Sequence, residues 1–217
     1  MKILVVGPQE EFNQFEQKFG EKHELTREEH VSAVEEMNVY DVVFDFNIAE
    51  QPEDFGFYAN QKDLKVFINA PKMSLAELAY FQDEVDCHLF GFNGIKTFIN
   101  REVLEVSCYS EANLLEETCK ELSTDFEIVQ DRVGMVTPRI ICMIINEAFY
   151  TVQEGTSSRE DIDKGMKLGT NYPYGPFEWM DKIGLNDVYE LLEAIYEDTK
   201  EERYKICPLL KSEYLKN

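Results

Sequence analysis

Residues Glu160–Glu178 read EDIDKGMKLGTNYPYGPFE, and the helix boundaries in this stretch decide the architecture of the second half of the chain. Ser157 and Glu160 have the spacing of a capping box, which predicts that a helix begins there, and Gly169 is expected to end it. Gly175-Pro176 predicts the start of a second, short helix, because proline is favoured at the first helical position. This stretch therefore predicts two helices joined by a turn.

Helical signals extend from this stretch in both directions. Upstream, Thr137 as N-cap and Pro138 at the first helical position predict a helix that closes near Gly155. Downstream, Gly184 ends the short helix and Asn186 is expected to cap a longer one. That longer helix carries one apolar stripe, formed by Val188, Leu191, Leu192, Ile195 and Tyr196. We expect an all-helical domain over residues 132–217.

The first half alternates short apolar runs with amphipathic segments, which predicts a mostly parallel α/β layer over residues 1–131. The expected strands are Lys2–Val6, Asp41–Phe46, Val66–Asn69, Cys87–Phe90, Val103–Cys108 and Phe126–Gln130. The expected helices are one with Phe12, Phe15 and Phe19 on its apolar face, Ser74–Phe81, and Glu111–Leu122 with Ser110 as its N-cap.

The second half resembles the C-terminal domain of the 3-hydroxyacyl-CoA dehydrogenase family. That family has an acidic helix start, then MKLG, YPxGPFE and D-x-x-GL, and this chain matches these motifs in register over about 50 residues. The matching signature residues, to which we assign structural roles, are Asn146, Glu147, Tyr172, Pro173, Gly175, Pro176, Phe177, Glu178, Asp181 and Gly184.

The resemblance implies a Rossmann-like dinucleotide-binding domain followed by a helical domain that dimerises and closes over an acyl chain. It also implies NAD as cofactor, an acyl-CoA ligand and a homodimer formed through the helical domain. The fold expected here is a shortened Rossmann-like parallel sheet domain followed by the helical domain.

The loop after the first strand departs from the family. The family carries G-x-G-x-x-G there, whereas this chain reads GPQEEFN, and only Gly7 fits as a cofactor-binding residue. Pro8 has no N–H to offer a pyrophosphate, and Glu10 and Glu11 place carboxylates in the first helical turn. These residues predict poor NAD binding.

The family's catalytic pair is a histidine base in HFFNP and a glutamate in LVEV that orients it. Here residues 87–94 read CHLFGFNG, and the later VLEV contains Glu105. Alignment on Phe92-Asn93 puts Phe90 at the histidine position, whereas a two-residue insertion puts His88 there. His88 is therefore the candidate general base, with Glu105 to orient it.

Two further family positions are altered. The family's S-N-T-S-S-L loop reads APKMSL here, and Ser74 is the one hydroxyl that keeps register, which makes it the candidate substrate-binding residue. The asparagine of P-G-F-x-x-N-R falls on Pro138, whose side chain cannot hydrogen-bond a substrate carbonyl.

Composition excludes several classes of protein. Residues 1–131 hold 28 Asp and Glu against 10 Lys and Arg, a net charge of −18, whereas residues 132–217 hold 15 against 11, a net of −4. Nucleic-acid binding needs a basic face and is therefore not expected. The five cysteines form no CxxC pair, so we expect neither disulfides nor a metal site, and a reducing cytoplasm is the expected location. No apolar run is long enough for a membrane span, and the N-terminal run is too brief for a signal peptide.

Two functions follow from these observations. The first is a family member that is catalytically degenerate and retains dimerisation and an acyl-CoA ligand. The alternative is an active NAD-dependent 3-hydroxyacyl-CoA (3-hydroxybutyryl-CoA) dehydrogenase that uses His88 and Glu105. The altered residues in the first half favour the degenerate member.

Overall fold

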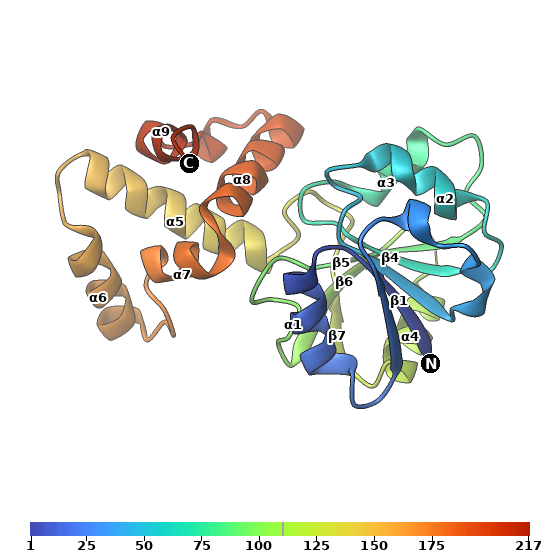
Figure 1. Ribbon diagram of the computed structural model, residues 1–217. Coiled ribbons are helices and arrows are strands. Elements are labelled where there is room, and N and C mark those ends of the chain that lie inside the picture. Colours follow the sequence, from blue (N-terminus) through green and yellow to red (C-terminus); the bar gives the residue numbers. More distant parts are fainter. Residues whose placement is uncertain (110) are drawn as a thin grey trace. The chain divides into compact units, whose positions relative to one another are not determined.

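A computed structural model describes residues 1–109 and 111–217, so the predicted N-cap Ser110 lies outside the described residues. The chain folds as two compact units, Met1–Met135 and Val136–Asn217 (Figure 1). The first unit is an α/β layer and the second is helical, as the sequence predicts. None of the described residues after Gly134 lies in a strand.

The first unit is built on one seven-stranded sheet in the order β2-β1-β3-β4-β5-β6-β7. Its strands are β1 (Lys2–Val6), β2 (Glu24–Glu28), β3 (Val42–Asp45), β4 (Lys65–Asn69), β5 (His88–Phe92), β6 (Val103–Cys108) and β7 (Asp125–Ile128). All neighbours pair in parallel except β5 and β6, which are antiparallel. The mostly parallel sheet expected from the sequence is confirmed, with β2 as a strand that the pattern did not predict.

Alternating apolar residues on the strands supply two cores, one on each face of the sheet. On one face, Ile3 and Val5 of β1 pack with Phe15 and Phe19 from the first helix. On the other face, Leu4 and Val6 pack with residues from the segments that follow β3 and β4. Both faces are covered, as expected for a doubly wound sheet.

Helices of the first unit are short. They are α1 (Gln9–Phe19), α2 (Gly56–Ala59), α3 (Leu75–Tyr80) and α4 (Ala112–Glu121), with 3₁₀ turns η1 (Val31–Ala33), η2 (Met37–Val39) and η3 (Pro52–Phe55). Between β2 and β3 the chain forms only η1 and η2 and then returns to the other side of β1. The sheet therefore changes winding direction between β1 and β3, the position where an open α/β sheet places its ligand crevice.

The second unit consists of helices of unequal length. They are α5 (Thr137–Gln153), α6 (Arg159–Thr170), α7 (Pro176–Ile183), α8 (Leu185–Thr199), the 3₁₀ turn η4 (Glu202–Tyr204) and α9 (Pro208–Tyr214). Three predicted N-caps are displaced by one or two residues: the caps are Val136, Ser158 and Gly184, where Thr137, Ser157 and Asn186 were expected. Ser158 is the cap because its hydroxyl accepts the N–H of Asp161 at 3.2 Å.

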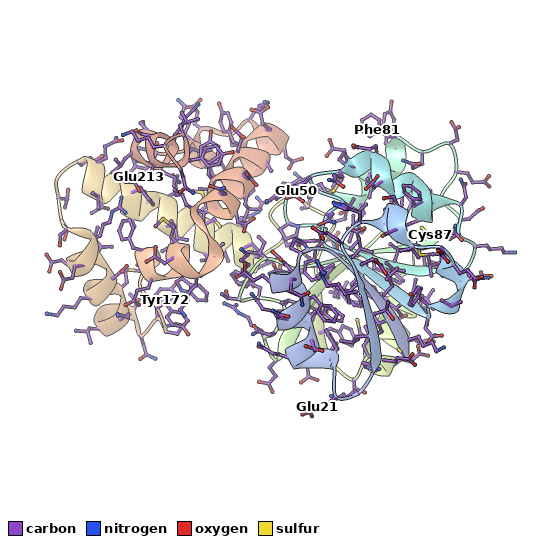
Figure 2. All side chains as sticks on the ribbon, viewed as in Figure 1. Glu21, Glu50, Phe81, Cys87, Tyr172 and Glu213 are labelled. Atoms are coloured by element: carbon purple, nitrogen blue, oxygen red, sulfur yellow. The ribbon has the colours of Figure 1, made fainter. Side chains whose placement is uncertain are left out.

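An ion pair joins two helices that are distant in the sequence. Arg159 at the start of α6 pairs with Glu213 on α9, which Figure 2 labels in the helical unit. The Arg159 guanidinium also lies over the rings of Phe149 and Phe177, at 5.0 and 4.8 Å from their centroids.

Along the described part of the chain, no helix combines the length and hydropathy needed to cross a bilayer.

Candidate functional site

At the carboxyl ends of β1 and β3, the side chain of Phe46 lies against Gly7. Phe46 follows β3, is 4% exposed, and packs against the backbone of Gly7, which follows β1. A Cβ on Gly7 would lie 2.9 Å from Cβ of Phe46, so glycine is needed here for the approach of this ring. The Phe46 ring makes edge contacts with Phe15 and Phe92, at centroid distances of 6.4 and 5.0 Å.

Polar groups of Gly7 are also satisfied within the protein. The Gly7 N–H donates to the carbonyl of Glu28 at 2.9 Å. The Gly7 carbonyl accepts from Nε of Arg27 at 3.0 Å, and Arg27 is itself 4.0 Å from Glu29. The single glycine that matched the family's cofactor motif therefore binds β2.

The start of α1 is also unfavourable for an anion. Pro8 is the N-cap and offers no N–H, and the Glu10 carboxylate pairs with Lys96 at 2.9 Å. Thr97 then donates its N–H to the Gln14 side chain at 3.0 Å, which holds the loop after β5 along α1. A pyrophosphate needs close backbone approach and free N–H groups at a helix start, whereas here Phe46 lies against Gly7 and Pro8 removes one of those N–H groups. They do not fit a dinucleotide.

His88 lies at the wrong end of its strand for catalysis at the carboxyl edge. It is the first residue of β5, and its Nδ1 contacts a carboxylate oxygen of Glu111 while its Nε2 lies 4.0 Å from Asp63. Sites in parallel sheets form at the opposite edge, where the strands end. This position does not favour the insertion that aligned His88 with the family's histidine.

Glu105 lies at the carboxyl edge of β5, away from His88. The antiparallel register sets Phe92 opposite Val106, and the carbonyl of Glu105 accepts the N–H of Asn93 at 3.0 Å. Asn93 is five residues beyond His88, which corresponds to about 16 Å along a strand. Phe90, at the family's histidine position in the ungapped alignment, is 1% exposed in the core. The predicted pair of His88 and Glu105 does not form.

Ser74 has a structural role in this fold. It is the N-cap of α3, where its hydroxyl accepts the N–H of Glu77 at 3.1 Å. The Asp131 carboxylate accepts the N–H groups of Leu75 and Ala76 at 2.8 and 2.9 Å, so the start of this helix is already satisfied. Pro138, at the family's asparagine position, is buried in the first turn of α5.

The helical signature builds the junction between α6 and α7. The Asp163 carboxylate accepts the N–H groups of Phe177 and Glu178 at 2.9 and 3.2 Å, which satisfies the start of α7. Glu178 accepts the N–H of Gly175 at 3.0 Å and pairs with Lys167, and these two interactions lower its pKa, Lys167 more strongly. A Cβ on Gly175 would lie 2.3 Å from Oδ1 of Asp163, so only glycine fits there.

Other signature residues stabilise the unit in similar ways. Asn146 on α5 is 3% exposed; its side chain donates to the carbonyl of Lys205 at 2.9 Å and accepts the N–H of Cys207 at 2.8 Å. Pro176 starts α7, and Gly184 has a φ of 106° between α7 and α8, a conformation that favours glycine. The remaining positions vary in exposure, from buried Phe177 through half-buried Tyr172 to exposed Glu147, Pro173 and Asp181.

The described side chains form neither a disulfide nor a metal site. All five cysteines are free thiols, and burial raises the pKa of Cys119 to about 12. Within the described residues, no group of three or more His, Cys, Asp or Glu side chains is arranged to hold a metal ion.

Asp45 is a buried carboxylate that the sequence pattern did not identify. It ends β3, is 1% exposed, and accepts the Tyr58 hydroxyl and the Asn47 N–H, both at 2.6 Å. Burial raises its pKa to about 6, although these hydrogen bonds act in the opposite direction. The only sequence signal was an acidic residue inside the apolar run VVFDF.

This pKa gives Asp45 a defined effect on stability. Because the pKa of Asp45 is raised, the folded chain binds this proton more tightly than the unfolded chain does. The protonated Asp45 therefore contributes fully to the free energy of unfolding below pH 4, and this contribution is lost as the pH rises through 6. Between pH 5 and pH 8 the loss should be roughly 1.5 kcal/mol. We expect Asp45→Asn to remove this part of the pH dependence in urea unfolding. Asp83→Asn, at an exposed position, should leave this pH dependence in place. If the free energy of unfolding changed equally with pH in the two variants, the pH dependence would not come from Asp45.

Comparison with known proteins identifies the second unit. The family model described as 3-hydroxyacyl-CoA dehydrogenase, C-terminal domain, matches residues 134–217. A 3-hydroxyadipyl-CoA dehydrogenase of Escherichia coli is 44% identical over 87 residues, covering 40% of this chain and 18% of that protein. A 3-hydroxybutyryl-CoA dehydrogenase of Clostridioides difficile is 30% identical over 156 residues, covering 69% of this chain and 55% of that protein. The chain thus spans less than two thirds of the length of these relatives.

Solved structures extend the likeness of fold to both units. The (S)-3-hydroxybutyryl-CoA dehydrogenase PaaH1 of Ralstonia eutropha superposes with a TM-score of 0.71 at 20% identity, covering 97% of this chain and 92% of that one. FadB2 of M. tuberculosis gives a TM-score of 0.75 at 16% identity with the same coverage. Residues 134–217 therefore form a 3-hydroxyacyl-CoA dehydrogenase C-terminal domain, and both units share the fold of these enzymes.

Proposed function

We propose that this chain is a catalytically degenerate member of the family. The observation that carries the proposal is the separation of His88 from Glu105, because a general base must lie within hydrogen-bond reach of the group that orients it. The Phe46 ring packed against Gly7 adds a second obstacle, at the place where the cofactor's pyrophosphate would lie. Each obstacle alone would suppress hydride transfer to NAD.

The retained role is assembly, as a homodimer through the helical unit. α6 contains no buried residue, and Leu168 on this helix is 78% exposed. Its half-buried apolar residues Ile162 and Met166 are only partly covered within the unit. A twelve-residue helix with such a surface is stabilised when a second copy covers it.

An acyl-CoA ligand and a reducing compartment complete the proposal. The relatives named above act on CoA thioesters by their names, and this chain retains their C-terminal domain. Five free thiols support a cytoplasmic location, where cysteines stay reduced.

An assay of NADH oxidation with acetoacetyl-CoA tests the loss of catalysis. We expect turnover at least about 10⁴-fold below that of an intact relative assayed in parallel, since loss of a member of a catalytic unit costs roughly this much. Any residual rate should be unchanged in His88→Ala. Turnover within tenfold of the relative, abolished by His88→Ala, would instead support an active NAD-dependent dehydrogenase that uses His88 and Glu105.

A further inference from the structure

A hollow of about 490 Å³ opens on the surface of the first unit, away from the crevice at Gly7. It lies between the end of α1, the residues that precede β6, and the turn from α4 to β7, which Figure 1 labels in this unit. Its charged lining consists of Lys18, Lys22, Arg101 and Lys120, with Glu102 and Asp125. Asn100, Ser123 and Thr124 add neutral polar side chains.

The gathering of cations is unusual for this half of the chain. Residues 1–131 contain 10 Lys and Arg against 28 Asp and Glu, and four of the ten line this one hollow. They come from three separate segments. Within the lining, four cations stand beside two carboxylates, so the hollow is less acidic than the rest of this half of the chain.

Neutral backbone groups hold two of these lysines in place. The Lys18 ammonium donates to the carbonyls of Arg101 and Glu102, the latter at 3.1 Å, and the Lys22 ammonium donates to the carbonyl of Ser123 at 2.9 Å. Across the described residues, neither lysine has a carboxylate oxygen within 4.0 Å. Each ammonium has three donors, so at least one on each remains for a ligand.

The other two cations have partial partners. Lys120 lies 3.6 Å from Glu116 on the same helix, an exposed pair of low strength. The Arg101 guanidinium lies over the Phe98 ring at 4.1 Å from its centroid. Burial lowers the pKa of both Lys18 and Arg101, with Asp125 and Glu105 acting in the opposite direction. A bound anion would relieve this cost.

We propose that this hollow binds a compact, hydrophilic polyanion, such as the diphosphate group of a small metabolite or a tricarboxylate. Its volume lies within the range of small-molecule sites, and its lining is polar and charged, which does not suit an acyl chain. A ligand with several charges can contact cations from more than one of the three segments at once. This site is independent of the assembly role proposed above.

Thermal unfolding of the full chain with inorganic pyrophosphate tests the proposal. Sodium chloride at equal ionic strength is the reference, because salt alone screens the repulsion within a chain of net charge −22. With a dissociation constant near 1 mM, 10 mM pyrophosphate should raise the Tm by roughly 3–5 °C above that reference. Citrate in a third arm separates the two chemistries: an equal shift supports any polyanion, and a shift with pyrophosphate alone supports a phosphate ligand.

Two matched double variants localise the effect. Lys22→Gln/Lys120→Gln removes two exposed cations of the hollow and should abolish the shift. Lys62→Gln/Lys216→Gln removes the same number of exposed lysines elsewhere and should keep it. A shift no larger than that in sodium chloride, or one that both double variants retain or lose alike, would overturn the proposal.

Discussion

NADH is expected to bind the unmodified chain with a dissociation constant above about 1 mM, a binding free energy weaker than about −4 kcal/mol. The Phe46 ring occupies the backbone surface of Gly7 that a pyrophosphate would need, and Arg27 already uses the carbonyl of that glycine. Entry of the dinucleotide would require displacement of a ring that packs against Phe15 and Phe92. Removal of a buried phenylalanine side chain costs roughly 3–5 kcal/mol, which indicates the scale of this barrier.

Calorimetry of NADH into the protein at two salt concentrations measures this. Glu10→Gln/Glu11→Gln should change the affinity less than about threefold, because Lys96 already compensates Glu10 and the ring, rather than the charge, is the main obstacle. Asp83→Asn/Glu84→Gln, which removes two exposed carboxylates elsewhere, is the matched control. Micromolar binding by the unmodified chain would show that the crevice opens, and the active dehydrogenase would then become the better proposal.

Substitution of Leu168 by glutamate is expected to weaken the proposed homodimer at least about 100-fold, since an unpaired charge buried at an interface costs several kcal/mol. Leu168 is the most exposed large apolar residue of the helical unit. Sedimentation velocity at tens of micromolar should show a dimer for the unmodified chain and a 25.3 kDa monomer for Leu168→Glu.

Phe81→Glu is the matched control for this variant. Phe81 is 74% exposed and belongs to the other unit, as its label in Figure 2 shows, so its replacement should leave the dimer intact. A monomer in the unmodified chain, or dissociation by both variants alike, would remove the support for assembly through the helical unit.

Local patterns were sufficient for most of the fold. The phenylalanines at 12, 15 and 19 predicted α1, and Gly175-Pro176 predicted the start of α7, because helix faces and helix ends are determined by near neighbours. β2 was missed because its sequence, ELTRE, is polar and half-buried at the edge of the sheet, and therefore lacks an apolar run.

The candidate site was harder to predict, since its contacts join residues far apart in the chain. Glu10 meets Lys96 across 86 positions, and no local pattern indicates that pairing. His88 and Phe90 both lie on β5. Because β5 begins at His88, this histidine lies at the edge of the sheet opposite the carboxyl ends of the parallel strands, and the sequence did not establish where β5 begins. Phe46 was read as the end of an apolar strand, and its contact with Gly7 depends on the parallel register of β1 and β3.

The loop after β5 has a consequence for synthesis of the chain on the ribosome. α1 emerges early, yet its polar partners are Thr97, the carbonyls of Arg101 and Glu102, and, through Lys22 just beyond it, the carbonyl of Ser123. At about 5–20 residues per second, the roughly 100 residues between Lys22 and Ser123 take some 5–20 s to make. During that interval Phe15 and Phe19 can pack with residues of β1, β3, β4 and β5, whereas other members of the same core, such as Leu115 and Cys119 of α4, come last. The core of the nascent first unit is therefore expected to stay incomplete for seconds, until α4 has been made.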